Sequence, residues 1–196
     1  MAWLEANALF NPDDLHNRVI GVCSALGQHD SGSHLHRMGQ LLFTRQGCVR
    51  LTLNNGALLC LLPPTRAAWI PAGIDHRAEM KSIVDYRSIW FHPTHYPALP
   101  RHPAILNVGP LLRELLERIA ASPWDSDWQN GIGWHLAALC EAEMCSAAQE
   151  PMMLALPQDK RLALLAGDAL PPPLQQLAVR CGASEKTISR IFRRDT

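Results

Sequence analysis

The chain has 196 residues, of which 47% are hydrophobic and 18% charged, so its composition excludes an intrinsically disordered protein and allows one or two domains. The net charge is zero, but residues 1–150 hold 11 Lys/Arg against 14 Asp/Glu, whereas residues 151–196 hold 7 against 4. The basic excess is therefore local to the C-terminal end, where it predicts a patch for an anionic partner.

Nothing in the sequence predicts a membrane or secreted protein. No apolar run is long enough to span a bilayer, and an N-terminus with Glu5 and no nearby Lys or Arg does not fit a signal peptide. The six cysteines contain no Cys-x-x-Cys pair and no dense framework, which favours reduced thiols. We therefore expect a cytoplasmic protein with no membrane partner.

Short apolar stretches separated by turn residues follow an irregular lead-in. Strands are expected at 19–26, 34–46, 48–53, 57–62, 67–70, 77–80 and 86–91. Asn54-Asn55-Gly56 between two of them is a strong hairpin signal. Many short strands at close spacing predict a small β-barrel or double-sheet roll.

Beyond His102 the apolar residues change to helical spacing. One stripe is formed by Leu111, Leu112, Leu115, Leu116 and Ile119. A second, longer helix is expected from about Asp127 to about Gln149. Two packing partners remain open for this pair of helices, the barrel or a second copy of the chain in a homodimer.

The C-terminal region is predicted to be all helical. Glu150-Pro151 marks a linker, a helix is expected from Asp159, and three prolines precede a further helix that starts at Leu174. Gly182 suits the end of that helix and Ser184 suits the N-cap of the next. Helix, tight turn and helix form the pattern of a helix-turn-helix DNA reader, with a plain helical hairpin as the alternative.

Histidines in the strand region are spaced for a common pocket. His34 and His36 are two apart, so on a strand both point to one face, and Gln40 follows on the same face. Together with the later turn, this spacing resembles the two motifs of the cupin family, carried here by His34, His36, Gln40 and Gly47, and by Pro71, Gly73 and His76.

The pocket departs from the cupin pattern at its ligand positions. Gln40 replaces the usual metal-binding glutamate, and Gln28, Thr65 and Met80 occupy other motif positions. Three imidazoles and an amide, from His34, His36, His76 and Gln40, can hold a divalent transition metal. The alternative is an organic effector that needs no metal. Its pocket is expected to be lined by His34, His36, Gln40, Trp69, His76 and Trp90.

A cupin barrel, a helical linker and a C-terminal helix-turn-helix in this order resemble the AraC family of transcriptional regulators. The run SEKTISRIF at 184–192 is similar to that family's recognition helix, with Ser184, Thr187, Arg190 and Phe192 matching and Ile188 in place of leucine. The resemblance implies an α+β chain with a cupin-type barrel at 1–102, a two-helix linker at 103–150 and a helix-turn-helix domain at 152–196.

The resemblance also implies how the chain works. The recognition helix would enter the major groove of double-stranded DNA, while a small-molecule effector occupies the barrel of a homodimer. Candidates for DNA contact are Lys186, Ser189, Arg190, Arg193 and Arg194.

One departure from the family concerns length. The family carries two helix-turn-helix units, and this chain stops just past the first recognition helix, so a truncated regulator is expected. We expect no enzymatic activity. Two alternatives remain, a metal-dependent cupin enzyme of dioxygenase or isomerase type, and a dimerising fragment that binds no DNA.

Overall fold

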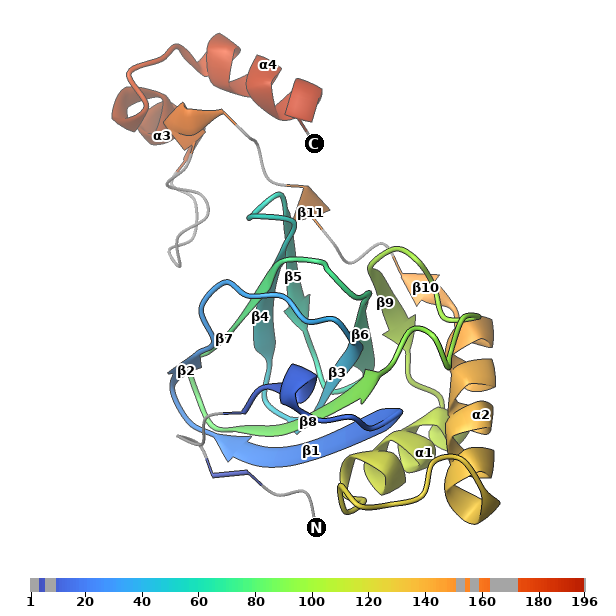
Figure 1. The fold of residues 1–196 in the computed structure, drawn as a ribbon. Coiled ribbons are helices and arrows are strands. Elements are labelled where there is room, and N and C mark those ends of the chain that lie inside the picture. Colours follow the sequence, from blue (N-terminus) through green and yellow to red (C-terminus); the bar gives the residue numbers. More distant parts are fainter. Residues whose placement is uncertain (1–3, 6–9, 151–153, 156–158, 163–172, 196) are drawn as a thin grey trace.

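The computed structural model describes residues 4–5, 10–150, 154–155, 159–162 and 173–195 (Figure 1). A six-stranded sheet contains, in spatial order, β1 (Val19–Leu26), β8 (Val84–Phe91), β3 (Gly39–Gln46), β6 (Arg66–Ile70), β9 (Ala104–Asn107) and β10 (Gln149–Glu150). A five-stranded sheet contains β11 (Leu154–Ala155), β5 (Leu58–Leu62), β4 (Val49–Leu53), β7 (His76–Met80) and β2 (His29–Asp30). All pairings in both sheets are antiparallel.

Helices precede, flank and follow the strands, which confirms the expected α+β class. They are η1 (Pro12–Asp14), α1 (Pro110–Ala120), α2 (Gly131–Ser146), α3 (Leu174–Arg180) and α4 (Glu185–Asp195). Figure 1 shows α1 and α2 together along one flank of the sheets, and α3 and α4 as a small unit apart from them at the top of the picture. No helix in the described part of the chain is long and apolar enough to span a bilayer.

The six-stranded sheet buries both of its faces, which explains its nearly unbroken apolar strands. On β3, Leu42 packs into the core between the two sheets, which we call the barrel interior. Its neighbours Leu41 and Phe43 point the other way, into a core shared with α1 and α2. Because side chains alternate along a strand, residues of one parity reach the barrel interior and those of the other reach the helices.

The two linker helices pack on the barrel, one of the two arrangements left open by the sequence. Leu112, Leu115 and Ile119 of α1 are buried against the six-stranded sheet, and Cys140 and Met144 of α2 join the same core. Ile132, Trp134 and Leu139 of α2 remain exposed. The homodimer therefore stays a prediction.

An ion-pair cluster fastens β8 to α1. The Arg87 side chain is only 6% exposed, and its Nε lies 3.3 Å from Glu117 Oε2 of α1. Arg87 also pairs with Asp85. Arg45 lies 3.4 Å from the other Glu117 oxygen, so this carboxylate joins two strands to the helix.

A close approach between β1 and α1 requires Gly21. A Cβ built on Gly21 would lie 2.2 Å from the Ile119 carbonyl oxygen. We expect Gly21→Ala to lower the free energy of unfolding by about 2–3 kcal/mol, because helix and strand must separate to admit the methyl group. Urea unfolding measures this, with Gly27→Ala as the matched control because no atom lies within 4 Å of its Cβ position. Equal stability of the two variants would contradict the close packing.

The Asn54-Asn55-Gly56 hairpin is confirmed. All three residues adopt positive φ, at 52°, 53° and 87°, and β4 pairs directly with β5. Asparagine and glycine tolerate this left-handed region at the lowest cost, so this turn fixes the register of the two strands.

Several element boundaries differ from the expectations. The strand expected at 34–46 is interrupted, because residue 34 forms only an isolated bridge and β3 begins at Gly39. Strands β9 and β11 were not predicted, and β11 shows that the region after residue 151 is not all helical. Helix α2 begins at Gly131 instead of near Asp127, whose carboxylate accepts bonds from the backbone N–H groups of residues 129 and 130 in the preceding turn.

The helix expected from Asp159 falls largely outside the described residues. Residues 160–162 form a short 3-10 turn, and the rest of that segment is not described. Two- to four-residue strands such as β9 and β11 carry too few side chains for a periodic signal, which is why the sequence does not reveal them.

Candidate functional site

A cavity of about 610 Å³ opens between the sheets and holds the predicted histidines. Its walls come from the N-terminal segment, the loop before β3, and strands of both sheets. The polar lining includes His34, His36, Gln40, His76 and Tyr86. The apolar lining includes Phe10, Val22, Leu42, Met80 and Trp90.

Backbone hydrogen bonds bring the histidine motifs together. His34 and His76 form a two-way bridge, with N–H to O distances of 3.0 and 2.8 Å. The N–H of Gly73, which adopts a φ of 78°, donates to the His36 carbonyl at 2.8 Å. The turn that begins at Pro71 therefore places His76 opposite the His34-x-His36 segment.

The three imidazoles form one compact cluster. Their ring centroids lie 4.3 Å apart for His34 and His76, 4.8 Å for His34 and His36, and 5.2 Å for His36 and His76. One ring nitrogen from each lies within 4.8 Å of the others, a spacing that would allow all three to reach one ion.

Backbone carbonyls fix the tautomers of two of these rings. His76 Nδ1 lies 2.9 Å from the Ile74 carbonyl oxygen, and His34 Nδ1 lies 3.0 Å from the Gly32 carbonyl oxygen. A carbonyl oxygen only accepts, so Nδ1 carries the proton and Nε2 presents a lone pair. His76 Nε2 is buried and has no hydrogen-bond partner among the described residues.

Burial keeps two of the histidines uncharged. Desolvation, followed by the neighbouring imidazoles, lowers the pKa of His36 from 6.5 to about 4. Desolvation also lowers the pKa of His76 from 6.5 to about 4, opposed by its bond to the Ile74 carbonyl. Both rings therefore accept hydrogen bonds or metal ions at neutral pH.

These pKa shifts predict acid sensitivity. Because the unfolded chain binds more protons than the folded chain between pH 6.5 and about 4, the free energy of unfolding falls as pH falls through this window. The loss between pH 7 and pH 5 is on the order of 2 kcal/mol for each histidine. Urea unfolding in EDTA should show it, and His76→Asn should flatten the pH profile. A profile that the substitution leaves unchanged would contradict the assignment.

Gln40 lies at the base of the cavity, where hydrogen bonds hold its amide nitrogen and fix the direction of its amide oxygen. Its Nε2 donates to Ser88 Oγ at 2.8 Å and to Tyr86 Oη at 3.2 Å. Ser88 Oγ donates in turn to the Leu41 carbonyl at 3.5 Å, so it accepts from Gln40 and orients the amide. This orientation leaves Gln40 Oε1 buried with no hydrogen-bond partner among the residues that the structure describes.

Trp69 does not line this cavity, although the sequence placed it there. Trp69 pairs with Leu41 across the ladder and shares its parity, so it packs with Phe91 on the helix-facing side. Its Nε1 donates to the Pro100 carbonyl at 2.7 Å. Trp90, also predicted, lines the cavity and has its ring 5.9 Å from that of His36.

The sequence missed several cavity residues. Tyr86 and Ser88 are four and two residues before Trp90 on β8, so their side chains point to the same face of the strand. This two-residue spacing could have predicted them from the sequence. Phe10 comes from the N-terminal segment and lies 5.2 Å from the Trp90 ring, which no local pattern indicates.

At the C-terminal end, α3 and α4 are joined by a well-formed turn. Gly182 has a φ of 58°, and its N–H and that of Ala183 donate to the carbonyls of Val179 and Ala178, a Schellman ending of α3. Ser184 caps α4, with its Oγ accepting from the Thr187 N–H at 3.2 Å.

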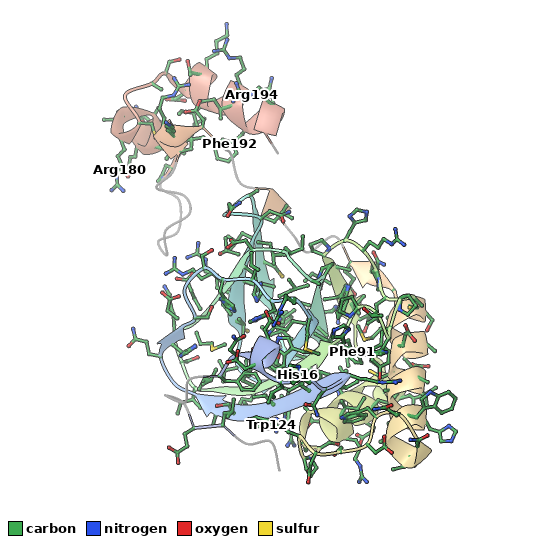
Figure 2. The ribbon with its side chains drawn as sticks, in the orientation of Figure 1. His16, Phe91, Trp124, Arg180, Phe192 and Arg194 are labelled. Carbon is green, nitrogen blue, oxygen red and sulfur yellow. The ribbon has the colours of Figure 1, made fainter. Side chains whose placement is uncertain are left out.

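One side of this helix pair is apolar and another is basic. Leu162, Leu177, Ala178, Ile188 and Ile191 form its core, and Phe192 packs against them (Figure 2). Lys186, Arg190, Arg193 and Arg194 are exposed, while Ser189 is half-buried. Arg194 lies close enough to Asp159 to contribute to the lowered pKa of that carboxyl, after the larger effect of Arg161.

Fold and site together define an α+β protein with a histidine-lined cavity inside a two-sheet barrel and a basic helix pair at its C-terminal end. No family model matches the chain. The HTH-type transcriptional regulator NimR of Escherichia coli (strain K12) is 29% identical to it over 113 residues, which are 57% of this chain and 40% of that protein. The chain is therefore similar to a transcriptional regulator and spans about two fifths of its length.

Two solved structures that resemble this chain have lower sequence identity to it than NimR has. An RmlC-like cupin from Shewanella frigidimarina NCIMB 400 is 16% identical with a TM-score of 0.31, over 34% of this chain and 60% of that chain. Oxalate decarboxylase from Bacillus subtilis is 10% identical with a TM-score of 0.32, over 76% of this chain and 35% of that chain. The expectation of no enzymatic activity is corrected on this finding and withdrawn, because the matched structures include an enzyme.

Proposed function

We propose that this chain is a ligand-responsive transcriptional regulator of the AraC type, acting in the cytoplasm as a homodimer, with a cupin-type barrel as its sensor. The observation that carries the proposal is the capped helix pair with a basic exposed side, in a chain similar to a bacterial transcriptional regulator. In this proposal α3 and α4 form the helix-turn-helix unit, and the sensor includes the strands β9, β10 and β11, which lie beyond residue 102.

The helix pair supplies the chemistry that DNA binding needs. Ser184 caps the start of α4 and the Schellman turn ends α3, while the shared apolar core packs the two helices together. Lys186 and Arg190 are one helical turn apart on the exposed side and would reach base edges or phosphates, with Ser189 beside them. Arg193 and Arg194 follow in the last turn and would contact the phosphate backbone.

The cavity supplies the effector site of the same proposal. It offers about 610 Å³, within the usual range for small-molecule pockets, and its polar atoms gather around His34, His76 and Gln40. The exposed apolar residues of α2, Ile132, Trp134 and Leu139, are the surface on which a second copy would pack.

Selection from a random duplex library tests the DNA-binding part. The purified chain at low salt should enrich a short motif over successive rounds, because a basic helix in the major groove discriminates base edges. Arg190→Ala should enrich no motif under the same conditions. Failure of the unaltered chain to enrich any sequence would contradict the proposal and favour a dimerising fragment that binds no DNA.

A metal-dependent cupin enzyme is the second candidate, and the histidine cluster favours it. The lone pairs of His34, His36 and His76 would suit a divalent transition metal, and the buried His76 Nε2, with no hydrogen-bond partner among the described residues, supports this. Gln40 Oε1 is a fourth candidate donor. Such an ion would act as a Lewis acid on a bound substrate. In the cavity, Tyr86 would stay protonated, since burial raises its pKa to about 12.

Metal content separates the two candidates. Elemental analysis after dialysis against iron, nickel or zinc, without chelator, should give well below one ion per chain if the cavity serves an organic effector. Stoichiometric metal that is lost in His36→Ala would favour the enzyme. Circular dichroism of the variant would show that the loss is not caused by unfolding.

A further inference from the structure

The inner end of the cavity presents hydrogen-bond acceptors. His34 and His76 each commit Nδ1 to a backbone carbonyl, which leaves Nε2 as an acceptor in the neutral ring. Gln40 commits its amide nitrogen to Ser88 and Tyr86, which leaves Oε1 as a third acceptor. The His76 and Gln40 atoms are buried and have no partner within the described part of the chain, and an unpaired buried polar atom is costly. A ligand that satisfies them must donate.

The charges around the cavity oppose an anion. Among the described residues that line it, none is Lys or Arg. The acids that line it are Glu5, which is exposed, and Asp30, whose carboxylate is bound by the Arg77 guanidinium at 2.8 Å. A ligand cation would find no buried counter-charge among these residues, and a ligand anion would find no cationic side chain, with the Trp90 N–H and the Tyr86 O–H as donors beside several acceptors.

The remaining walls are apolar and flat. Phe10, Trp90 and Tyr86 offer ring faces or edges, and Val22 and Met80 continue the apolar surface. Trp90 is part of this wall, and its buried Nε1 donor has no partner in the described residues, so an acceptor on the ligand would satisfy it.

We infer that this cavity binds an uncharged organic molecule with an apolar body, N–H groups that donate to His34 Nε2, His76 Nε2 and Gln40 Oε1, and an acceptor for Trp90 Nε1. The inference deepens the proposed function, on which it rests for the view that the cavity is an effector site. A neutral primary amide on a flat ring has the apolar body, one acceptor, and two N–H donors for two of the three acceptors, whereas the matching carboxylate has no donor and carries a charge.

Three ligands of one shape test the inference. Benzamide is neutral with N–H donors, benzoate is an anion without donors, and benzamidine is a cation with donors. Isothermal titration of the full chain in EDTA at pH 7.5 should show benzamide binding at least tenfold more tightly than either of the others. Benzoate or benzamidine binding as tightly as benzamide would overturn the inference, as would no benzamide binding up to its solubility limit.

Substitutions at Gln40 test whether benzamide donates a hydrogen bond to this residue. Gln40→Leu removes the acceptor and should weaken benzamide about tenfold, because the amide proton then faces an apolar wall. Gln40→Glu keeps the shape of the side chain and adds a negative charge, so this variant should prefer benzamidine. Because it tests the same position independently, the conclusion does not depend on whether Gln40→Leu folds. Unchanged benzamide affinity in both variants would overturn the inference that a ligand N–H group donates to Gln40 Oε1.

Two further measurements separate this inference from its premises. Arg190→Ala should bind benzamide like the unaltered chain while losing DNA, so a chain that binds DNA but not benzamide overturns only the inference. A chain that binds benzamide but no DNA supports the inference and contradicts the regulator. Zinc that binds stoichiometrically without chelator and displaces benzamide would overturn the inference in favour of a metal site.

Discussion

Replacing Arg190 by alanine is expected to lower the affinity of the chain for its preferred DNA site about 10- to 100-fold. Arg190 is exposed on α4, whose buried positions Ile188 and Ile191 face the small C-terminal core. An arginine at this place can form paired bonds with a guanine edge, and their loss costs about 1–3 kcal/mol. Fluorescence anisotropy on the motif found by selection measures the change.

Two control variants distinguish sequence-specific base contacts from non-specific electrostatic binding to DNA. Arg193→Ala should weaken all duplexes alike and reduce the salt dependence by about one phosphate contact. Arg45→Ala, on β3 of the barrel, should leave DNA binding unchanged. If Arg190→Ala binds DNA like the unaltered chain, α4 is not the reading helix.

Replacing Glu117 by alanine is expected to lower the free energy of unfolding by about 2–3 kcal/mol. The substitution removes a carboxylate from the buried Arg87 guanidinium, which keeps Asp85 beside it, and it removes the nearer of the two carboxylates that Arg45 contacts. Guanidinium unfolding followed by far-UV circular dichroism measures the loss.

The matched control for this cluster is Glu114→Ala on the same helix. Glu114 is exposed, so its loss should change the free energy of unfolding by about 0.5 kcal/mol or less. Glu117→Gln should fall between the two, because the amide oxygen still accepts from Arg87. Equal stability of Glu117→Ala and Glu114→Ala would show that the cluster does not hold α1 on the barrel.

Turn residues and strong periodicity made much of the fold predictable. The Asn54-Asn55-Gly56 turn required positive φ, so the hairpin around it could be recognised from local chemistry. The stripe of α1 was equally clear, because its apolar residues repeat at helical spacing. Strands β9 and β11 have four and two residues, and their pairing with distant strands leaves no local trace.

The candidate site was predictable where a motif spans it. His34, His36 and His76 come together as expected, because a bridge and a glycine turn fix their backbones. Trp69 was misplaced for a physical reason: β6 is buried on both faces, so hydrophobicity alone does not say which parity reaches the cavity. The register between β3 and β6 decides it, and register depends on contacts distant in sequence.

Direct titration of DNA with the purified chain tests the central claim, that this molecule is a DNA-binding regulator. The probe is a labelled duplex from the region upstream of the gene, followed by fluorescence anisotropy from about 50 to 200 mM salt. The account predicts saturable binding at low salt, stronger than to a shuffled duplex, that weakens steeply as salt rises. No rise in anisotropy at the lowest salt, with a chain shown to be folded, would contradict it.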